Sequence, residues 1–518
     1  MEEQIYYRPI WTCGRYNEEK QVAIYYNLIA GMSYFFESYS AMVIGEILAV
    51  LRNGKIDIKT IATKLNIAVE SLTPFFEQLK QMGLVTVKIP NESDIKSYRN
   101  IASSQNKKEM QGKQSLMQDI QSIGQSDAEM MYSEKVGGVN AVMFELTYNC
   151  SEKCIHCYNI GATRNEDEIS FRGHRNELGL NDYKRIIDEF YDLGIVRVCL
   201  TGGDPFSKSI IWEIIDYLYN KEIAIDIFTN GQRLLGHEEK LANYFPRVVG
   251  ISIYSGEAEV HDYITRVKGS WKKSMNCLKR LSELGVSLYV KCCVLQPNFK
   301  SYWQVADIAL KHGAMPQYEV SIMNSLDGDM CASRYLRLEK EQLEIVLRDP
   351  NVPLWVDSEL TNYGSFKRNL GRNGCGVGND NFCVTPEGKI TLCCSFHSPI
   401  GDLTKTSVKE TLENNKSLEW WRSLTLNDYE ECGRHDYCDF CNLCPGINFS
   451  EHGTPLKASE TCCYMAKVRY ELAQKLRNGQ DPLNGKNISE RVKDFVDYKP
   501  VKIRRIMSQD FSSTKLKN

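Results

Sequence analysis

Apolar runs of strand length alternate with amphipathic stretches six times between about residues 139 and 335. The apolar runs are five to seven residues long and rich in Val, Ile and Leu, which favours strands buried on both faces. They are Val142–Leu146, Val196–Leu200, Ala224–Phe228, Val248–Ile253, Leu288–Val294 and Tyr318–Ile322. Helical periodicity lies between them, in Tyr183–Leu193, Ile210–Tyr219, Trp271–Leu284 and Tyr302–His312.

This alternation indicates parallel strands joined by crossover helices. We therefore predict an α/β domain over residues 139–335, in the form of a TIM-like partial (β/α)6 barrel. Six units are fewer than the eight that close a full barrel, so the barrel should be open. Its chemistry should lie at the C-terminal ends of the strands.

Residues 1–90 show a different pattern, in which strand-like runs come first and helices follow. The runs Val22–Leu28 and Ser33–Phe36 flank a turn at Gly31, and Ala41–Leu51 has helical periodicity. A short helix (Ile58–Leu65), a longer helix (Val69–Met82) and a strand (Val85–Val87) should follow. This order of elements predicts a winged helix-turn-helix domain.

The other regions differ in composition. Residues 91–138 are rich in Ser, Gln, Asn and Lys, which predicts a linker with at most a weak amphipathic helix. Residues 336–370 bridge to a Cys-rich region over 371–470 that needs metal to hold it together. Residues 471–518 form a C-terminal tail, polar and basic from about 486, which we expect to be partly disordered.

The overall composition limits the possible classes of protein. A chain of 518 residues is too long for one hydrophobic core, and 42% hydrophobic with 25% charged residues is ordinary for folded proteins. The net charge of -3 gives no reason to expect a general nucleic-acid or membrane-surface binder. No run approaches the roughly 18 apolar residues of a membrane span, and the acidic start is unlike a secretory signal. We expect a cytoplasmic protein.

Nineteen cysteines are abnormal for such a protein. Cytosolic thiols stay reduced, so clustered cysteines indicate metal or redox chemistry more often than disulfides. Six of them lie outside the clusters, and we interpret them as small buried hydrophobic residues. They are Cys13, Cys199, Cys277, Cys292, Cys293 and Cys331. The other thirteen lie in or near tight groups.

The first group is a C-x3-C-x2-C run, Cys150, Cys154 and Cys157, directly after the first predicted barrel strand. Three thiolates on one loop can bind three irons of a cubane cluster and leave the fourth iron open for chemistry. A structural zinc site would need a closed set of four ligands. His156 could complete such a set only if its ring folded back on the loop, so the spacing favours the cluster.

At these residues the sequence resembles the radical SAM enzymes, whose motif is this Cys run with an aromatic residue at the place of His156. A second resemblance is Thr201-Gly202-Gly203-Asp204-Pro205, which follows the second predicted strand. The resemblance implies that this segment, with Gly202, Gly203 and Asp204, contacts the amino group of S-adenosylmethionine. It also implies cofactor contacts for Asn230, for Ser252 on the ribose side and for Arg266 at the carboxylate.

The Cys-rich region resembles the SPASM extension of that family. Cys375 is followed by twelve residues, Gly388, four residues and Cys393, with Pro386-Glu387-Gly388 as a hairpin turn. The resemblance implies one or two auxiliary [4Fe–4S] clusters on seven ligands, Cys375, Cys393, Cys432, Cys438, Cys441, Cys444 and Cys463. The middle spacing departs from the family pattern of C-x2-C-x5-C-x3-C, so His435 or Cys383 could complete one site. Cys394 and Cys462 are expected to be bystanders, and a zinc ribbon is the alternative for this region.

The N-terminal domain most simply suggests DNA binding, but the predicted helix from Val69 has two acidic residues and no basic residue before Lys80. Residues 1–88 hold nine basic and nine acidic side chains, which gives phosphates no electrostatic attraction. The order of elements also resembles the peptide-recognition element of ribosomal-peptide maturation systems, which binds a leader peptide along a sheet edge. A purely structural cap on the barrel is the third possibility.

Taken together, the resemblances imply a radical SAM enzyme that modifies a ribosomally made precursor peptide. An electron from a donor such as flavodoxin or ferredoxin would enter the first cluster, and S-adenosylmethionine would give a 5'-deoxyadenosyl radical. Thioether formation between Cys sulfur and an α-carbon is the first expectation, and carbon–carbon crosslinking, epimerisation or residue oxidation are alternatives. A non-catalytic iron–sulfur transcription regulator is the competing hypothesis. Asp327 and Asp329, just past the sixth strand, are candidate bases that a solvated turn explains equally well.

Overall fold

The computed structural model describes residues 5–101, 126–159, 176–326, 328–359, 371, 375–396, 398–503 and 506. Asp327, one of the two candidate bases, lies outside these residues.

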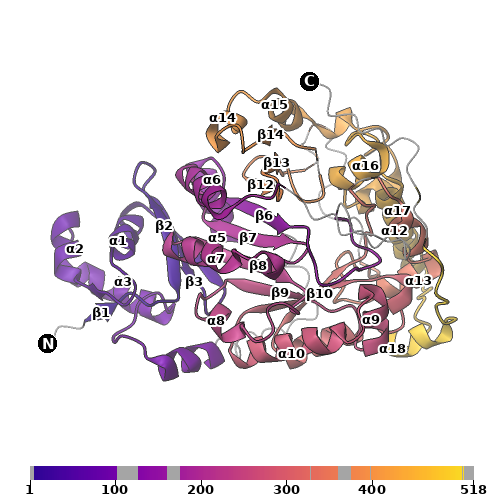
Figure 1. The fold of residues 1–518 in the computed structure, drawn as a ribbon, viewed down its shortest axis with the longest axis horizontal. Coiled ribbons are helices and arrows are strands. Elements are labelled where there is room, and N and C mark those ends of the chain that lie inside the picture. Colours follow the sequence, from indigo (N-terminus) through magenta and orange to yellow (C-terminus); the bar gives the residue numbers. More distant parts are fainter. Residues whose placement is uncertain are drawn as a thin grey trace.

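Six parallel strands form the centre of the molecule and lie side by side in chain order (Figure 1). They are β6 (Ala141–Thr147), β7 (Arg197–Gly202), β8 (Ala224–Thr229), β9 (Val248–Ser252), β10 (Leu288–Cys293) and β11 (Met315–Glu319). Each is parallel to its neighbours. The predicted α/β fold with a parallel sheet is confirmed. The last strand, however, begins and ends three residues before the prediction.

The shift of β11 has a physical reason. This strand lies at one end of the sheet, so it accepts Pro316, which would remove a ladder hydrogen bond from a central strand. The apolar residues Val320 and Ile322, on which the prediction depended, follow the strand and are buried beyond it.

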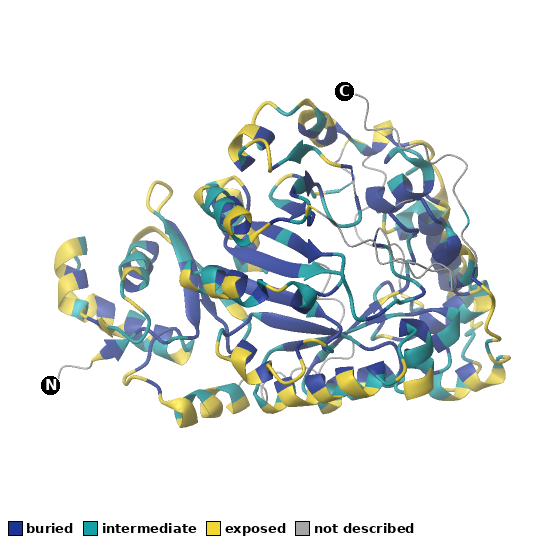
Figure 2. Cartoon of the chain, viewed as in Figure 1, coloured by how far each residue is buried: buried dark blue, intermediate teal, exposed yellow. Residues whose placement is uncertain are grey.

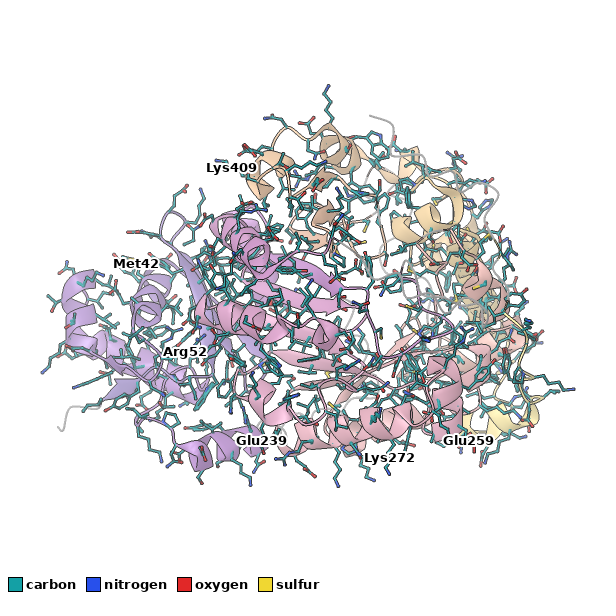
Figure 3. All side chains as sticks on the ribbon, in the orientation of Figure 1. Met42, Arg52, Glu239, Glu259, Lys272 and Lys409 are labelled. Atoms are coloured by element: carbon teal, nitrogen blue, oxygen red, sulfur yellow. The ribbon has the colours of Figure 1, made fainter. Side chains whose placement is uncertain are left out.

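Helices cover the outer face of these strands. They are α6 (Leu180–Asp192), α7 (Ile211–Asn220), α8 (Glu238–Ala242), α9 (Ala258–Thr265), α10 (Ser270–Glu283) and α11 (Gln304–Lys311), with 3-10 turns at Pro205–Ser207 and Gln296–Asn298. Helix α6 shows why they form, because Tyr183, Ile186, Ile187 and Phe190 repeat at helical spacing and are all buried. The strands are mainly buried and the outer helix faces exposed (Figure 2). Charged side chains such as Glu239, Glu259 and Lys272 project from α8, α9 and α10 into solvent (Figure 3).

The Cys-rich region extends the same sheet. Strand β12 (Asn381–Val384) pairs in parallel with β6, and β13 (Lys389–Thr391) and β14 (Gly401–Asp402) continue it as antiparallel strands. The predicted hairpin turn before Gly388 is present, with Gly388 in the left-handed region at φ 78°. The sequence did not reveal that this hairpin closes onto the first barrel strand.

Short helices complete the C-terminal half. They are α12 (Cys331–Tyr335), α13 (Lys340–Val346), α14 (Val408–Leu412), α15 (Lys416–Ser423), α16 (Pro445–His452), α17 (Glu460–Arg477) and α18 (Ile488–Arg491), with 3-10 turns at Leu426–Asp428, Asp436–Phe440 and Val492–Asp494. The described part of the predicted tail packs against the rest of the chain. Val492 is fully buried, and the rings of Phe495 and Phe299 pack edge to face with centroids 5.1 Å apart.

The N-terminal unit is a three-stranded antiparallel sheet with helices on one face. Its elements are β1 (Tyr6–Tyr7), β2 (Thr12–Asn17), β3 (Val22–Asn27), β4 (Met32–Glu37), α1 (Ser38–Ala49), β5 (Lys55–Ile56), α2 (Ile58–Leu65) and α3 (Val69–Gln81). The predicted helices are present. Strand β2 was not predicted, because its Arg15 and Asn17 break the apolar pattern. The predicted strand Val85–Val87 is reduced to one bridge, Thr86 to Tyr7.

Strand β3 is buried on both faces, and each face belongs to a different core. Ala23 and Tyr25 pack with α1 and α3, whereas Ile24 and Tyr26 pack towards the barrel. The barrel side of that second core includes Val196, Ala224 and Phe245, which lie at the N-terminal ends of the strands. The N-terminal unit is therefore attached to the end of the barrel opposite its C-terminal strand ends (Figure 1).

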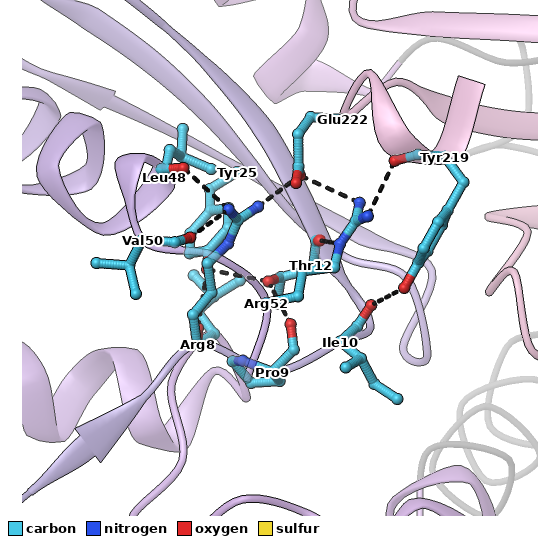
Figure 4. Close-up of polar contacts among 11 residues, drawn as sticks. Arg8, Pro9, Ile10, Thr12, Tyr25, Leu48, Val50, Arg52, Tyr219 and Glu222 are labelled. Carbon is cyan, nitrogen blue, oxygen red and sulfur yellow. Dashed lines mark hydrogen bonds and ion pairs between the residues drawn. The ribbon is translucent and has the colours of Figure 1, made fainter. Parts of the chain in front are cut away.

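A buried charge network strengthens this attachment (Figure 4). Both guanidinium groups of Arg8 and Arg52 pair with Glu222, which follows α7, at 2.5 and 3.1 Å. Arg8 also donates to the carbonyl oxygens of Leu48 and Val50 at 2.9 Å each. The side chain of Arg8 is only 2% exposed, so Glu222 supplies the charge compensation that a buried cation requires.

The predicted linker contributes to the same junction. Helix α5 (Asp127–Val136) begins at a Ser126 capping box and contains Glu129, which is fully buried. The Glu129 carboxylate accepts hydrogen bonds from Tyr26 (2.8 Å) and from Arg197 at the start of β7 (3.3 Å). Residues 126–136 thus form part of the core between the N-terminal unit and the barrel.

None of the helices within the described ranges combines the length and the apolar character needed to cross a bilayer. The expected cytoplasmic location stays a prediction.

Replacing Glu222 should loosen the N-terminal unit. Glu222→Ala leaves the buried Arg8 without its carboxylate, so we expect a loss of about 3 kcal/mol in the stability of this junction. Thermal unfolding and limited proteolysis would measure it as a lower Tm and faster cleavage. The control is Glu19→Ala, since Glu19 pairs with Lys20 in solvent and its loss should leave Tm unchanged. Equal behaviour of the two variants would contradict this account.

Candidate functional site

A cavity of about 540 Å³ lies at the C-terminal ends of the parallel strands. Its wall includes residues from the loop after β6, from the ends of β7–β11 and from the Cys-rich region. The predicted site residues that line it are Cys150, Cys154, Cys157, Gly202, Gly203, Asn230, Ser252 and Cys444. Asp204, Arg266 and the other six predicted auxiliary ligands do not line it. The fold thus brings the first Cys group, the glycine pair and one predicted ligand of the second field, Cys444, to one space.

The Cys150–Cys157 loop is fixed by its backbone. Lys153 N and Ile155 N donate to the carbonyl oxygens of Thr265 and Ile264 at 2.9 Å each. Ile155 is buried among apolar side chains, and the His156 ring packs edge to face on Tyr254 with centroids 4.8 Å apart. The ring of His156 therefore has the packing role of an aromatic residue.

Several polar groups surround the thiols of this loop. Asn230 Nδ2 donates to Cys150 Sγ at 3.3 Å, and the backbone N–H of Glu152 donates to the same sulfur at 3.4 Å. Cys154 Sγ lies 3.4 Å from Glu152 Oε2, and Gln232 donates to the other oxygen of Glu152 at 2.7 Å. Burial, as the largest cause, raises the pKa of Glu152 to about 7.

The thiols themselves are suited to iron. Burial raises the pKa of Cys150 and Cys154, so both stay protonated at neutral pH when no cation is near. Bound iron supplies the positive charge that favours the thiolate. The donor set therefore fits an iron cluster.

The glycine pair is required by the approach of two chain segments. A Cβ on Gly202 would lie 2.3 Å from the carbonyl oxygen of Thr147, and one on Gly203 would lie 2.5 and 2.6 Å from those of Asn149 and Tyr148. Gly203 N also donates to Thr147 O at 2.7 Å. We expected these glycines to let the backbone come close to a ligand. They do line the cavity, but the contact that forbids a side chain is with the backbone leading into the Cys loop.

Asp204 was expected to contact the cofactor, and its observed contacts lie elsewhere. Its carboxylate is fully buried and accepts from Thr229 Oγ1 (2.6 Å), Asn230 N (3.0 Å) and Phe206 N (3.0 Å). These bonds connect the ends of β7 and β8 and orient Asn230, the donor to Cys150. Arg266 ends α9 with φ 56° and lies outside the cavity wall.

The second cysteine field divides into two sets of thiols. The first is Cys432, Cys438, Cys441 and Cys463. Burial, and then the thiols of Cys463 and Cys438, raise the pKa of Cys432 to about 12. Burial raises the pKa of Cys441 most, and the thiols of Cys462 and then of the other three members raise it further. The 3-10 turn at Asp436–Phe440 and the first turn of α17 bring them together.

The second set is Cys375, Cys393 and Cys444. Burial raises the pKa of Cys393 most, and the thiols of Cys394, Cys444 and Cys375 raise it further. Cys444 interacts with Cys375 and also lines the cavity. Hence this set reaches the same space as the Cys150–Cys157 loop.

The sequence left His435 and Cys383 as candidate ligands, and it predicted Cys394 and Cys462 to be bystanders and Cys292 and Cys293 to be buried hydrophobic residues. His435 is exposed, and its ring stacks on that of Tyr437 with centroids 4.9 Å apart. Cys383 is buried within β12, and Cys462 is buried beside Cys444. Cys394 lines the cavity, as do Cys292 and Cys293, although only Cys293 of that pair is partly exposed. The sequence missed this role for Cys293 because a strand position does not reveal which face borders the cavity.

Among the described residues, no three His, Cys, Asp or Glu side chains converge tightly enough to hold a single metal ion. A cubane cluster makes a different geometric demand, because each thiolate binds its own iron atom.

Family models match two parts of the chain. Residues 144–306 match the radical SAM superfamily, and residues 375–445 match the SPASM iron–sulfur cluster-binding domain. The chain contains a radical SAM domain and a SPASM domain. The radical SAM domain implies a [4Fe–4S] cluster and S-adenosylmethionine, and the SPASM domain implies auxiliary clusters.

Proteins similar to this chain have names that refer to different products. The chain is 25% identical over 310 residues to the antilisterial bacteriocin subtilosin biosynthesis protein AlbA of Bacillus subtilis, a match that covers 58% of this chain and 66% of AlbA. It is 20% identical over 363 residues to the AdoMet-dependent heme synthase of Oleidesulfovibrio alaskensis, covering 63% of this chain and 88% of the synthase.

A solved structure shares the fold. The structure of anSMEcpe with bound AdoMet and the Cp18Cys peptide has a TM-score of 0.50 and 15% identity, over 67% of this chain and 99% of that one.

A side chain at Gly203 should disturb the cysteine loop of the radical SAM domain. We expect Gly203→Ala to lose most of its iron and sulfide from this loop, because the added Cβ meets backbone oxygens that cannot move alone. Iron and sulfide analysis in a variant that lacks the SPASM cysteines would isolate the effect. Gly179→Ala is the matched control, since a Cβ there meets Asp182 at an ordinary 3.5 Å. Full cluster content in Gly203→Ala would show that the close approach is not a constraint.

Proposed function

We propose that this protein is a radical SAM enzyme that modifies a ribosomally made precursor peptide, and that its product is a thioether between a Cys sulfur and an α-carbon. The supporting observation is one cavity bordered on one side by the Cys150–Cys157 loop and on the other by Cys444 of the three-thiol set. A substrate between them would be close to a radical-generating centre and to a second iron–sulfur centre at the same time.

The residues of the loop would bind and orient the first cluster. Cys150, Cys154 and Cys157 are its proposed ligands, and Asn230 would keep its N–H directed at the Cys150 sulfur. With S-adenosylmethionine, the reduced cluster would supply one-electron chemistry that removes a hydrogen atom from a C–H bond. Gly202, Gly203 and Ser252 line the cavity where S-adenosylmethionine is proposed to bind. Asp204 would act by positioning Asn230, and a carboxylate contact for Arg266 has less support, because Arg266 does not line the cavity.

The thioether product is favoured over the alternatives by the three-thiol set. Cys375, Cys393 and Cys444 would hold an auxiliary cluster with three protein thiols, and a substrate Cys thiolate has the right chemistry for the remaining corner. Cys444 would orient that corner towards the cavity. The four-thiol set would hold a second, fully ligated cluster, and an external reductant such as flavodoxin or ferredoxin would supply electrons.

One incubation tests the catalytic proposal. Reduced and reconstituted protein with S-adenosylmethionine should form 5'-deoxyadenosine, and with the precursor encoded beside the gene it should give a peptide two hydrogens lighter per crosslink. Cys154→Ala should form neither product. Cys444→Ser should still form 5'-deoxyadenosine but no crosslinked peptide, since its first cluster is intact. Mass spectrometry measures both products, and a crosslinked peptide from Cys444→Ser would exclude the role given to the three-thiol set.

The N-terminal unit is proposed to bind the leader of this precursor. Strand β4 is an edge strand of the sheet β2–β4, and edge strands bind peptides through main-chain hydrogen bonds. Helix α3 borders it, because Phe36 of β4 and Phe75 of α3 pack edge to face with centroids 6.1 Å apart. Tyr34 and Phe75 are only partly buried and offer apolar contacts beside the edge.

DNA binding by this unit has less support. Glu77 of α3 accepts a hydrogen bond from Tyr6 at 2.5 Å and pairs with Lys80, so the helix offers no free row of basic side chains among the described residues. In addition, the hypothesis of a non-catalytic transcription regulator assigns no function to the radical SAM domain.

Truncating Phe75 should weaken leader binding. We expect Phe75→Ala to lower affinity for a synthetic leader peptide about tenfold, because an aromatic contact beside the edge strand is lost. Thr73→Ala, at an exposed position on the same helix, should bind as the wild type does. Fluorescence anisotropy measures both, and equal affinity of the two variants would place the leader elsewhere.

A further inference from the structure

One wall of the cavity carries polar groups that belong to none of the three cysteine sets. Strands β10 and β11 pair Lys291 with Gln317 and Cys293 with Glu319. Alternate residues of a strand share a face, and all four of these residues line the cavity. The wall therefore presents an ammonium, an amide and a carboxylate at neighbouring positions.

The amide of Gln317 is the most informative of these groups. The residue is 7% exposed, and neither its oxygen nor its nitrogen has a hydrogen-bond partner among the described residues. Burying an amide without partners is costly, and native structures rarely do so away from functional sites. A ligand that both donates and accepts would remove this cost.

Lys291 likewise has hydrogen-bond donors to spare, although Glu319 and Cys293 lie near its ammonium group. Its ammonium lies 3.4 Å from the centroid of the Phe228 ring, and it makes no hydrogen bond or ion pair with the described part of the chain. Its three N–H donors can bind a carbonyl oxygen.

Glu319 supplies the complementary acceptor. One of its oxygens accepts from Ser321 N at 2.6 Å, and the carboxylate borders the cavity. Together with Lys291 it makes the wall neutral overall, which favours a neutral ligand over an anion or a cation.

The location of the wall connects the two iron–sulfur regions. Cys293 lies near Cys157 of the radical SAM loop, Glu319 lies near Cys444 of the SPASM domain, and all four residues line the cavity. A ligand bound along Lys291, Gln317 and Glu319 would therefore lie between the radical SAM cysteine loop and the SPASM cysteines. The proposed reaction requires the reacting part of the substrate to lie at this place.

From these observations we propose that Lys291, Gln317 and Glu319 bind the backbone amides of the substrate segment that is modified. Gln317 accepts from one peptide N–H and donates to one peptide C=O, Lys291 donates to a neighbouring carbonyl oxygen, and Glu319 accepts a further N–H. These are positioning residues that hold the chain in register without reading its side chains. This inference rests on the proposed peptide substrate.

The test compares variants that keep the shape of the wall but lose its hydrogen bonds. Gln317→Leu and Lys291→Met should each raise the KM for the synthetic precursor about tenfold, since a buried partner is left unmatched in the complex. Gln317→Glu keeps the shape and one acceptor but loses the donor, so its KM should rise as well. Binding of S-adenosylmethionine and peptide-free formation of 5'-deoxyadenosine should change by less than about twofold. Lys311→Met, on the exposed end of α11, is the matched control.

The possible outcomes separate this inference from the proposed function. A wild-type enzyme that modifies the peptide, with unchanged KM in Gln317→Leu and Lys291→Met, would overturn the inference alone. A parallel loss of S-adenosylmethionine binding would assign the wall to the cofactor and also overturn it. If the wild type neither binds nor modifies the peptide, both proposals are wrong. Equilibrium peptide binding and iron content are measured on each variant. These measurements distinguish a folding defect from the expected loss of peptide affinity.

Discussion

The functional end of this molecule depends on the close approach of the β7 terminus to the backbone that leads into the first cysteine loop. Gly202 and Gly203 allow an approach that any Cβ would prevent, since each would meet a carbonyl oxygen within 2.6 Å. Asp204 then bonds across to Asn230, which donates to Cys150. One tight contact thereby fixes the loop, the end of β7 and the end of β8 relative to one another. The hydrogen bonds from Lys153 N and Ile155 N to the carbonyl oxygens of Thr265 and Ile264 hold the same loop from the side of α9.

The SPASM domain and the barrel share a sheet, and this has a consequence for the cavity. Because β12 pairs with β6, the β12–β13 hairpin of the SPASM domain lies beside the strand that leads into the first cysteine loop. Cys394 and Cys444 thus reach the same space as Cys150–Cys157. The two cysteine fields are separated by more than two hundred residues in sequence and border one cavity in the fold.

The N-terminal unit lies at the other end of the strands. Its second core and the Arg8–Glu222–Arg52 network attach it to the N-terminal ends of the barrel strands. A peptide bound along β4 would have to pass along the outside of the barrel before it entered the cavity. The attachment is both apolar and ionic, so the unit is held in a defined orientation.

The local sequence pattern was sufficient to predict much of the fold and part of the candidate site. The parallel sheet, most helices, the cysteine loop and the glycine pair could all be predicted, because periodicity and short spacings are properties of neighbouring residues. The sequence could not show which face of a strand borders the cavity, so Cys293, Lys291, Gln317 and Glu319 were not identified as wall residues. Nor could it divide the second cysteine field, because Cys444 and Cys441 are three residues apart and yet belong to different sets. Pairing between distant strands and the packing of α17 decided those positions, and contacts of that kind leave no periodic signal in the chain.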